Sequence, residues 1–386
     1  MSLTLGSDRL LSSPWLRGRR VGLVCNPASV DASLRHVADR FAASRHGTLA
    51  ALFGPQHGFR ADVQDNMIET AHARHARGIP VYSLYSETRE PTPDMLAGLD
   101  ALVIDLQEIG ARIYTFIATM AACLRAGRRH GLPVVVCDRP NPIGGVAVEG
   151  PMLAPGFESF VGPFPMPMRH GMTMGELARL FNDHFGIGAD LTVAPMEGWS
   201  RDMYWADTGL PWVMPSPNVP VADTAIVYPG TVLLEGTNAS EGRGTTKPFE
   251  IVGAPWVHAE TFAGRLNRAG LEGVRFRPVV FEPTFQKHAG RPCGGCQIHV
   301  LDRTAFRPVR AAVAVIAELR RADPAQFAWR QPPYEYEQVR LPIDILAGSE
   351  RLRQQIEQGM DASDIAGGWD LDVQPFLKIR EEARLY

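Results

Sequence analysis

Short apolar runs alternate with amphipathic stretches through the N-terminal half of the chain. The runs predict buried strands at residues 21–25, 49–53, 81–84, 101–106 and 134–137. Between the last two, apolar residues at helical spacing predict one buried helix face, made by Ile113, Ile117, Met120, Ala121 and Leu124. Strands separated by helices in this way predict an α/β fold, with a mostly parallel sheet covered by helices on both faces.

Local signals mark further helix starts. Residues 34–43 have the pattern of an amphipathic helix. Thr92-Pro93 combines a capping hydroxyl with a proline suited to the first turn. The segment 173–176, Thr-Met-Gly-Glu, is a capping box and predicts a helix running towards residue 184.

The pattern changes between residues 210 and 229, where prolines interrupt any long element. We interpret this stretch as an irregular crossing between two domains. Beyond it the pattern is again mixed, with a helix expected at 262–268, a strand at 297–301 and a helix at 307–320. We therefore predict one domain at residues 1–225 and a smaller one at residues 226–386.

Polar residues follow each predicted strand where the strand ends. They lie at residues 26–27, 54–58, 85, 105–115 and 138–142. Because ligands of open parallel sheets bind beyond the carboxyl ends of the strands, these clusters predict one ligand-binding edge. Each also has a structural interpretation. Asn26 and Asn141 form turns, Asp105 is suited to capping a helix, Arg112 to an ion pair, and His57 to tying a loop to a carbonyl group.

Residues 234–249 have no hydrophobic periodicity. The segment reads Leu-Glu-Gly-Thr-Asn-Ala-Ser-Glu-Gly-Arg-Gly-Thr-Thr-Lys-Pro-Phe. Its glycines allow backbone amides to approach a ligand closely, and its acids, arginine and hydroxyls supply donors and acceptors. A solvated linker has a similar composition, but a linker does not require charged residues at fixed places among glycines. We expect a loop that contacts a ligand.

The overall charge limits the classes of partner. The formal net charge of −3 over 386 residues gives no electrostatic reason to expect a nucleic acid or an anionic membrane surface. No apolar run approaches the roughly 20 residues that a membrane span needs. The N-terminal residues lack the pattern of a secretory signal, so we expect a cytoplasmic protein.

The sequence also lacks the common cofactor motifs. The first predicted strand is not followed by the G-x-G-x-x-G of dinucleotide sites, and there is neither a Walker lysine nor a G-x-S-x-G elbow. Cys293 and Cys296 have C-x-x-C spacing without the second pair that a zinc site wants, so we expect a turn with incidental thiols. We predict neither a cofactor nor a metal.

Several segments form a specific set when they are taken in order. They include Gly-Leu-Val-Cys-Asn-Pro-Ala-Ser-Val-Asp, Asp-Leu-Gln-Glu-Ile-Gly-Ala-Arg-Ile-Tyr-Thr and the loop quoted above. With this set the chain resembles the DUF1343 family, the group that includes the NamZ exo-β-N-acetylmuramidases. The matching segments are residues 22–31, 52–60, 81–96, 100–117, 134–145, 149–151, 169–178, 214–220 and 234–256.

The resemblance implies both a fold and an activity. The fold would be a Rossmann-like N-terminal α/β domain and a smaller α/β (α+β) C-terminal domain with a cleft between them. The activity would be removal of terminal N-acetylmuramic acid from peptidoglycan fragments, in the recycling of cell-wall sugars. The partner would then be a small carbohydrate, either a muramyl sugar or a muropeptide.

The residues fit such a substrate chemically. Its lactyl carboxylate calls for a bidentate arginine, its hydroxyls and acetamide call for amides and hydroxyls, and glycosidic cleavage normally needs two carboxyl groups. We predict catalytic roles for Gln56, His57, Asp105, Tyr114 and Glu241. We predict sugar-binding roles for Asn26, Glu108, Arg112, Arg139, Asn141, Asn218, Glu235, Thr237, Asn238 and Arg243.

One position departs from the family pattern. The family usually has Pro-Glu-His-Gly where this chain has Pro-Gln-His-Gly at residues 55–58, and that glutamate is a leading candidate for the catalytic acid. An amide is neither an acid nor a base, so three alternatives stay open. Another carboxyl, with Glu241 and Asp105 as candidates, takes the role. Alternatively, Gln56 orients a water or the acetamide of the substrate. In the third alternative the chain binds muramyl ligands as a sensor without cleaving them, or acts on a different sugar.

Overall fold

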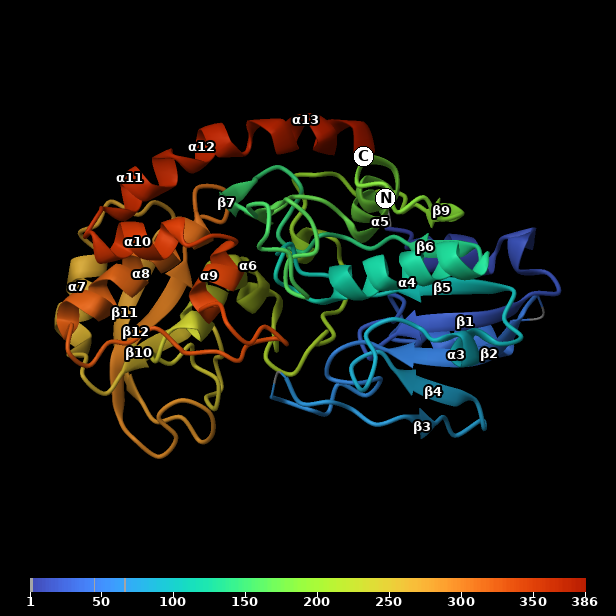
Figure 1. Ribbon diagram of the computed structural model, residues 1–386, viewed down its shortest axis with the longest axis horizontal. Helices are drawn as coiled ribbons and strands as arrows, with labels where there is room; N and C mark the ends of the chain where they lie inside the picture. The colour runs from blue at the N-terminus through green and yellow to red at the C-terminus, as the bar shows by residue number, and fades with distance from the viewer. Residues whose placement is uncertain (1–2, 45, 66) are drawn as a thin grey trace.

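A computed structural model describes residues 3–44, 46–65 and 67–386. Two lobes lie side by side (Figure 1). The first lobe is built on a seven-stranded sheet of order β3-β4-β2-β1-β5-β6-β9. Its strands are β1 (Arg20–Cys25), β2 (Thr48–Gly54), β3 (Ala73–Arg74), β4 (Pro80–Ser83), β5 (Ala101–Asp105), β6 (Val134–Cys137) and β9 (Leu191–Ala194). All neighbouring strands run parallel except β3 and β4, so the predicted α/β class with a mostly parallel sheet is confirmed.

Apolar residues on the two faces of the sheet belong to two separate cores. Along β1, Val21 and Leu23 pack in one core and Val24 packs in the other. The first core includes helix α2, and the second includes the apolar face predicted for helix α4. The helices of this lobe are α1 (Gly6–Leu11), α2 (Val37–Ala43), α3 (Pro93–Leu96), α4 (Phe116–His130) and α5 (Met174–Arg179), with the single turns η1 (Pro14–Leu16), η2 (Leu180–His184) and η3 (Trp205–Asp207).

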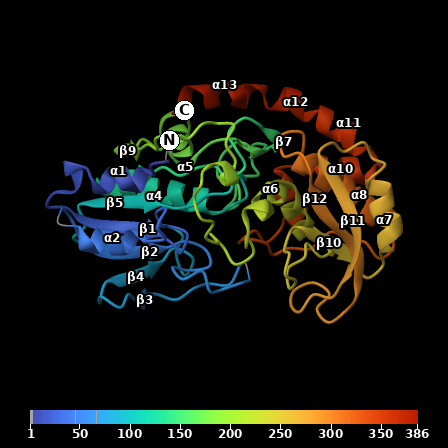
Figure 2. The same cartoon turned by 180° about the vertical axis from the view of Figure 1, so that it is seen from behind.

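The predicted helix starts are present. Thr92 accepts a hydrogen bond from the backbone of Met95 at the start of α3. Thr173 and Glu176 form the reciprocal capping box of α5. A small two-stranded sheet of β7 (Glu149–Met152) and β8 (Pro167–Arg169) interrupts the first lobe in sequence, and in space β7 lies between the two lobes (Figure 2).

The second lobe has an antiparallel sheet of order β10-β12-β11. Its strands are β10 (Ile251–Ala254), β11 (Val274–Phe281) and β12 (Cys293–Val300). Its helical elements are α6 (Ala222–Thr231), η4 (Val232–Gly236), α7 (Ala259–Leu266), α8 (Pro308–Ala322), α9 (Pro342–Ala347), α10 (Arg351–Glu357), α11 (Ala362–Gly367), α12 (Trp369–Asp372) and α13 (Gln374–Ala383). The last three run from the second lobe back towards the first, and the chain ends near its start (Figure 1).

Two local expectations were wrong. Residues 222–229 are helical and not irregular. Pro229 lies within α6, and the packing of α6 against α8 accompanies a helix that includes this proline. Cys293 and Cys296 lie in β12 and not in a turn. The two glycines between them allow the sheet backbones to approach, since a side-chain carbon at Gly295 would lie 2.0 Å from the carbonyl oxygen of Val252.

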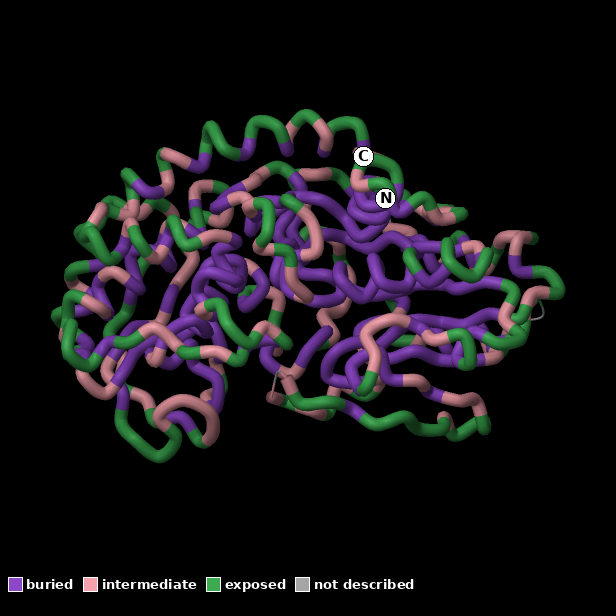
Figure 3. Tube along the Cα trace, in the orientation of Figure 1, coloured by how far each residue is buried: buried purple, intermediate pink, exposed green. Residues whose placement is uncertain are grey.

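Burial follows the sheets and the interface between the lobes. Figure 3 shows buried chain running through the first sheet and α4, whereas the C-terminal helices are partly exposed. In the part of the chain that the structure describes, no helix is long and apolar enough to cross a membrane. Within the same residues, no group of three or more His, Cys, Asp and Glu side chains is placed to hold a metal ion.

Candidate active site

A small cavity between the lobes gathers many of the polar residues singled out from the sequence. Its volume is about 30 Å³, room for little more than one water molecule. It is lined by Gln56, His57, Ile113, Tyr114, Thr115, Phe116, Val161, Ser216, Asn218, Tyr228, Glu235, Arg243, Phe249, Tyr334 and Glu335. The structure thus brings together Gln56, His57, Tyr114, Asn218, Glu235 and Arg243, whose roles stay predictions.

Gln56 and Glu335 contact each other directly across this cavity. Nε2 of Gln56 donates to Oε1 of Glu335 over 3.1 Å. Oγ1 of Thr115 donates to Oε1 of Gln56 over 2.6 Å, and the Tyr85 hydroxyl donates to Oε2 of Glu335 over 2.9 Å. The Gln56 amide thus presents its N–H to Glu335 and its carbonyl oxygen to Thr115.

Glu335 lies at the tip of a tight hairpin between α8 and α9. Tyr334 and Glu337 exchange both backbone hydrogen bonds, each 2.9 Å long. The two residues between them, Glu335 and Tyr336, have φ angles of +43° and +71°. Hairpins of this length usually have Asn-Gly or a similar pair there, because other residues adopt positive φ reluctantly. The chain therefore holds Glu335 in the cavity against a local backbone cost.

The environment of Glu335 favours its protonated form. The residue is 4% exposed. Burial raises the pKa of Glu335 to about 7, against the opposing effect of the hydrogen bonds from Tyr85 and Gln56, and the negative charge of Glu235 adds to the rise. A carboxyl group that titrates near neutral pH has the property required of a general acid.

Arg243 is held between two buried glutamates on the other side of the cavity. Its Nη2 donates to Oε1 of Glu235 over 2.7 Å, and its Nε lies 3.2 Å from Oε1 of Glu241. The Tyr334 hydroxyl donates to Oε2 of Glu235 over 2.7 Å. The guanidinium carbon lies 5.1 Å from the centre of the Phe249 ring. These contacts fix the direction of the guanidinium group.

Several buried polar atoms on residues of the cavity wall have no hydrogen-bond partner among the described residues. They include Nη1 of Arg243, Oδ1 of Asn218 and the hydroxyl of Tyr114. Nδ2 of Asn218 donates to the carbonyl oxygen of Gln64 over 2.8 Å, so the side-chain carbonyl is fixed in orientation. Unpaired buried polar groups are costly and therefore uncommon. A cationic donor and an amide acceptor left open in one cavity indicate a polar ligand with an anionic group.

His57 contributes a neutral imidazole to the wall. Burial lowers the pKa of His57 to about 4, although the Val63 carbonyl acts in the opposite direction. Nδ1 of His57 lies 2.7 Å from that carbonyl oxygen. Nδ1 therefore carries the proton, and Nε2 is left as an acceptor, suited to a sugar hydroxyl.

Comparison with known proteins decides the family. Residues 21–223 match the family model described as exo-beta-N-acetylmuramidase NamZ, N-terminal, and residues 226–386 match its C-terminal counterpart. The chain belongs to the NamZ family. It is 44% identical to the peptidoglycan beta-N-acetylmuramidase NamZ of Bacillus subtilis (strain 168) over 383 residues, which cover 99% of this chain and 91% of that protein.

Solved structures agree with this placement in the NamZ family. Two crystal structures of DUF1343 family proteins from Bacteroides fragilis NCTC 9343 are similar to this chain. The first has a TM-score of 0.90 and 35% identity, and the second has a TM-score of 0.78 and 26% identity. Each match covers 100% of this chain and 99% of the other. The resemblance to the DUF1343 family is therefore confirmed.

Glu241, which we predicted to be catalytic, contacts Arg243 but does not line the cavity of this NamZ family member. Nζ of Lys287 lies 2.8 Å from its Oε2. Burial opposes ionisation, but Lys287 and Arg243 outweigh it and lower the pKa of Glu241. A carboxylate held between two cations has no proton to donate at neutral pH. The structure places the Glu241 carboxylate beside these two cations and outside the cavity wall, and its predicted catalytic role stays a prediction.

Asp105 and Arg139 form a buried ion pair and do not line the cavity. Both Nε and Nη2 of Arg139 donate to the Asp105 carboxylate, and Nη2 also donates to the carbonyl oxygen of Val30 over 2.9 Å. Each charge is neutralised by the other beneath the sheet edge. The structure thus does not bring Asp105 and Arg139 to the cavity, and the catalytic role predicted for Asp105 and the sugar-binding role predicted for Arg139 stay predictions.

Arg112 and Glu108 are also buried away from the cavity. Arg112 donates to the backbone carbonyl oxygens of Pro151, Met166 and Leu346. Burial lowers the pKa of Arg112 to about 9. Oε2 of Glu108 lies 3.4 Å from Nε2 of His170. The structure does not bring Arg112 and Glu108 to the cavity, and the sugar contacts predicted for them stay predictions.

The remaining predicted sugar-binding residues also lie outside the cavity, and each donates to a backbone carbonyl. These donors are Asn26, Asn141, Thr237 and Asn238, and their acceptors belong to Pro215, Met172, Leu234 and Gln326, in that order. These contacts fit the turn interpretation of Asn26 and Asn141, and the sugar-binding roles predicted for the four residues stay predictions.

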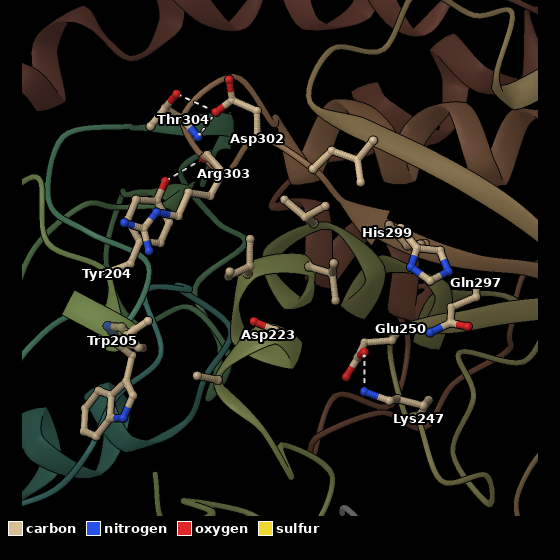
Figure 4. A pocket seen from close by; sticks show the side chains of 18 residues that line it. Tyr204, Trp205, Asp223, Lys247, Glu250, Gln297, His299, Asp302, Arg303 and Thr304 are labelled. Atoms are coloured by element: carbon tan, nitrogen blue, oxygen red, sulfur yellow. Dashed lines mark hydrogen bonds and ion pairs between the residues drawn. The ribbon is translucent and has the colours of Figure 1, made fainter. Parts of the chain in front are cut away.

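A larger cavity, of about 650 Å³, lies elsewhere between the lobes (Figure 4). Tyr204 and Trp205 lie on one side of it, opposite Gln297 and His299 of β12. None of the residues predicted for catalysis or sugar binding lines it. The size of a cavity alone does not identify an active site. We place the candidate active site at the small cavity, because a carboxyl group with a pKa near 7 and polar atoms without hydrogen-bond partners lie there.

Sequence reasoning missed Glu335 and Tyr334. They lie in residues 332–337, Pro-Pro-Tyr-Glu-Tyr-Glu, after α8. Aromatic and acidic residues alternate there, and the proline pair argues against a central strand. This combination is typical of a turn that directs side chains into a site. Acidic residues beside a proline pair also occur in solvated loops, so the pattern alone does not separate the two.

Proposed function

We propose that this chain is an exo-β-N-acetylmuramidase, a glycoside hydrolase that releases terminal N-acetylmuramic acid from peptidoglycan fragments. The observation that carries the proposal is one cavity between the lobes that holds two buried glutamates and an arginine with an open Nη1. The proposal is supported by 44% identity to a peptidoglycan beta-N-acetylmuramidase over nearly the whole chain.

Each feature of the cavity answers a need of that substrate. The open Nη1 of Arg243 is a charged donor for the lactyl carboxylate, which distinguishes a muramyl sugar from N-acetylglucosamine. The open Oδ1 of Asn218 is an acceptor for a hydroxyl or an acetamide N–H. Glu335 and Glu235 supply the two carboxyl groups that glycosidic cleavage normally uses.

The cavity is closed in this conformation. About 30 Å³ does not hold a sugar, so binding requires the walls to separate. Contacts between segments far apart in sequence join the two lobes, among them the hydrogen bond from Gln286 to Asp65 and, across the cavity itself, the one from Gln56 to Glu335. We therefore expect substrate entry to break contacts across the cavity.

A pair of chromogenic substrates tests the proposal. We expect turnover of 4-nitrophenyl N-acetyl-β-muramide with kcat/KM at least about 100-fold above that for the matching N-acetylglucosaminide, because only the muramide satisfies Arg243. Equal turnover of the two substrates would contradict recognition of the lactyl carboxylate by Arg243.

The alternative is a muropeptide sensor, which Gln56 favours because an amide stands at the family's usual carboxyl position. Saturable binding of the muramide without turnover from pH 4 to 9 would support the sensor and exclude the hydrolase.

A further inference from the structure

We propose that Glu335 is the general acid of this enzyme and that Gln56 is its positioning residue. This inference rests on the proposed hydrolase function and names the residue that performs its first proton transfer.

The geometry places the two positions within one hydrogen bond of each other. The Gln56 amide lies 3.1 Å from Oε1 of Glu335, so a proton on Glu335 is close to where a carboxyl at position 56 would hold one. Thr115 fixes the far end of the amide, and Tyr85 fixes the second oxygen of Glu335. Each carboxyl oxygen accepts one of these bonds and keeps a second lone pair for the acidic proton.

An amide at position 56 suits this assignment. Two carboxyl groups in such contact share one proton and titrate as a pair. With Gln56 in place, the neighbour is neutral and always a donor, so Glu335 titrates without a charged partner at that position. Gln56 acts through Glu335 and needs no proton of its own.

The hairpin also indicates a role beyond packing. Glu335 and Tyr336 both have positive φ angles, a backbone cost that Asn or Gly at these positions would lower. Arg89 lies 4.6 Å from the Tyr85 ring centre and 3.9 Å from that of Tyr336, and so joins the tip to the first lobe. The conformation that places the Glu335 carboxyl in the cavity therefore has a cost in backbone free energy.

The ionisable groups around Glu335 come from both lobes. Tyr85 faces it from the segment after β4, Glu235 from η4, and Arg243 from the loop after η4. Burial, with Glu235, raises the pKa of Glu335 to about 7, so a large part of the enzyme carries the acidic proton at neutral pH.

The proposed step is balanced as follows. The bond between the anomeric carbon and the glycosidic oxygen breaks, and its electron pair stays on that oxygen. The oxygen takes the proton of Glu335 and leaves as an alcohol. A water oxygen bonds to the anomeric carbon and releases one proton to solvent, from which Glu335 is protonated again.

Two leaving groups and an exchange of residues test the assignment. Glu335→Gln is expected to lose about 10²- to 10⁴-fold in kcat on a muramyl disaccharide, whose leaving alcohol needs a proton. It should lose far less on the 4-nitrophenyl muramide, whose leaving group departs as an anion. The double variant Gln56→Glu with Glu335→Gln returns a carboxyl to the neighbouring position and should regain disaccharide cleavage. Circular dichroism and Tm establish that each variant folds.

Gln56→Leu tests the positioning role. The hydrogen bond from Gln56 lowers the pKa of Glu335, so its loss should move the alkaline limb of the kcat profile to higher pH. An unshifted limb overturns the role of Gln56.

The outcomes separate the two proposals. If the wild-type chain cleaves neither substrate, the hydrolase function fails. If the wild type is active and Glu335→Gln cleaves the disaccharide equally well, only the assignment of Glu335 fails. Equal losses on both substrates in the folded variant, without recovery in the double variant, also overturn the assignment, because a merely structural role affects both substrates alike.

Discussion

Glu241 and Glu335 show how neighbours decide what a buried glutamate does. Burial disfavours the charge of both, but Lys287 and Arg243 lower the pKa of Glu241, whereas Glu335 has neutral donors and a second acid nearby. The same side chain is therefore an ionic anchor in one place and a proton source in the other.

Glu241→Gln tests the anchor. The change leaves Lys287 with a neutral partner in a buried site, so we expect a loss of about 3 kcal/mol in the free energy of unfolding at pH 7. Because the folded pKa of Glu241 is lowered, its contribution to stability is present at neutral pH and lost as the pH falls through the folded pKa, so the deficit shrinks in acid. Urea denaturation at several pH values measures this.

The matched control is Glu381→Gln, which removes an exposed partner of Arg384. We expect a change below about 0.5 kcal/mol. A folded Glu241→Gln enzyme with its kcat abolished would support Glu241 as a catalytic residue.

The stability of the Glu335→Gln variant should depend on pH with the opposite sign. Burial, against the hydrogen bonds of Tyr85 and Gln56, raises the folded pKa of Glu335 from its usual 4.5 to about 7, so stability is lost as the pH rises through this range. A glutamine does not ionise. Relative to the wild type, the variant should therefore gain up to about 3 kcal/mol between pH 4.5 and pH 8. A pH-independent difference in urea denaturation would contradict the raised pKa.

At the scale of elements, glycines decide how closely segments approach. Cys-Gly-Gly-Cys at residues 293–296 is a strand because Gly295 faces Gly253 across the ladder between β12 and β10. Each glycine allows backbones to meet where any side chain would collide. The turn predicted for Cys-Gly-Gly-Cys was wrong because the strand partner of this segment, β10, lies far away in the sequence.

Gly295→Ala should therefore disrupt the second lobe. The new carbon would lie 2.0 Å from the carbonyl oxygen of Val252, which is backbone and cannot swing away. We expect a loss of about 3 kcal/mol in the free energy of unfolding, measured by urea denaturation.

Gly264→Ala is the control within the same lobe. Gly264 lies in α7, and a carbon there would meet only the Arg268 side chain, at 3.5 Å. This variant should gain up to about 1 kcal/mol from helix propensity. Equal effects of the two substitutions would mean that the close approach does not matter.

At the scale of the whole molecule, the C-terminal helices connect the second lobe back to the first. The Tyr386 hydroxyl donates to Oδ2 of Asp138 over 2.8 Å and accepts from the backbone N–H of Met196 over 2.6 Å. Arg179 donates to the carbonyl oxygen of Arg384 over 2.8 Å. The end of the chain thus contributes to the polar network below the sheet edge.

Tyr386→Phe should weaken this connection by about 1 to 3 kcal/mol, because two partly buried polar groups lose their partner. Burial raises the pKa of Asp138 to about 7, and the Tyr386 hydroxyl opposes that rise. Its loss raises the pKa further, so the stability deficit should be larger at pH 8 than at pH 5. Thermal unfolding at the two pH values tests this, and a larger deficit at pH 5 would contradict it.

The sequence by itself determined the local elements of the first lobe and the family. Strand periodicity, capping signals and the apolar face of α4 depend on neighbours within a few residues, so these elements could be predicted from the sequence alone. The sequence also predicted site roles for Gln56, His57, Tyr114, Asn218, Glu235 and Arg243, and all six line the small cavity.

Only the tertiary structure decided which charges are paired and which are open. Asp105, Arg139 and Glu241 are residue types that often act in catalysis or ligand binding, yet each forms an ion pair with a residue of another segment. Glu335 finds an amide and a phenol instead, 279 and 250 residues away in sequence. Ionisation depends on such long-range neighbours and on burial, and neither is encoded within one stretch of the chain.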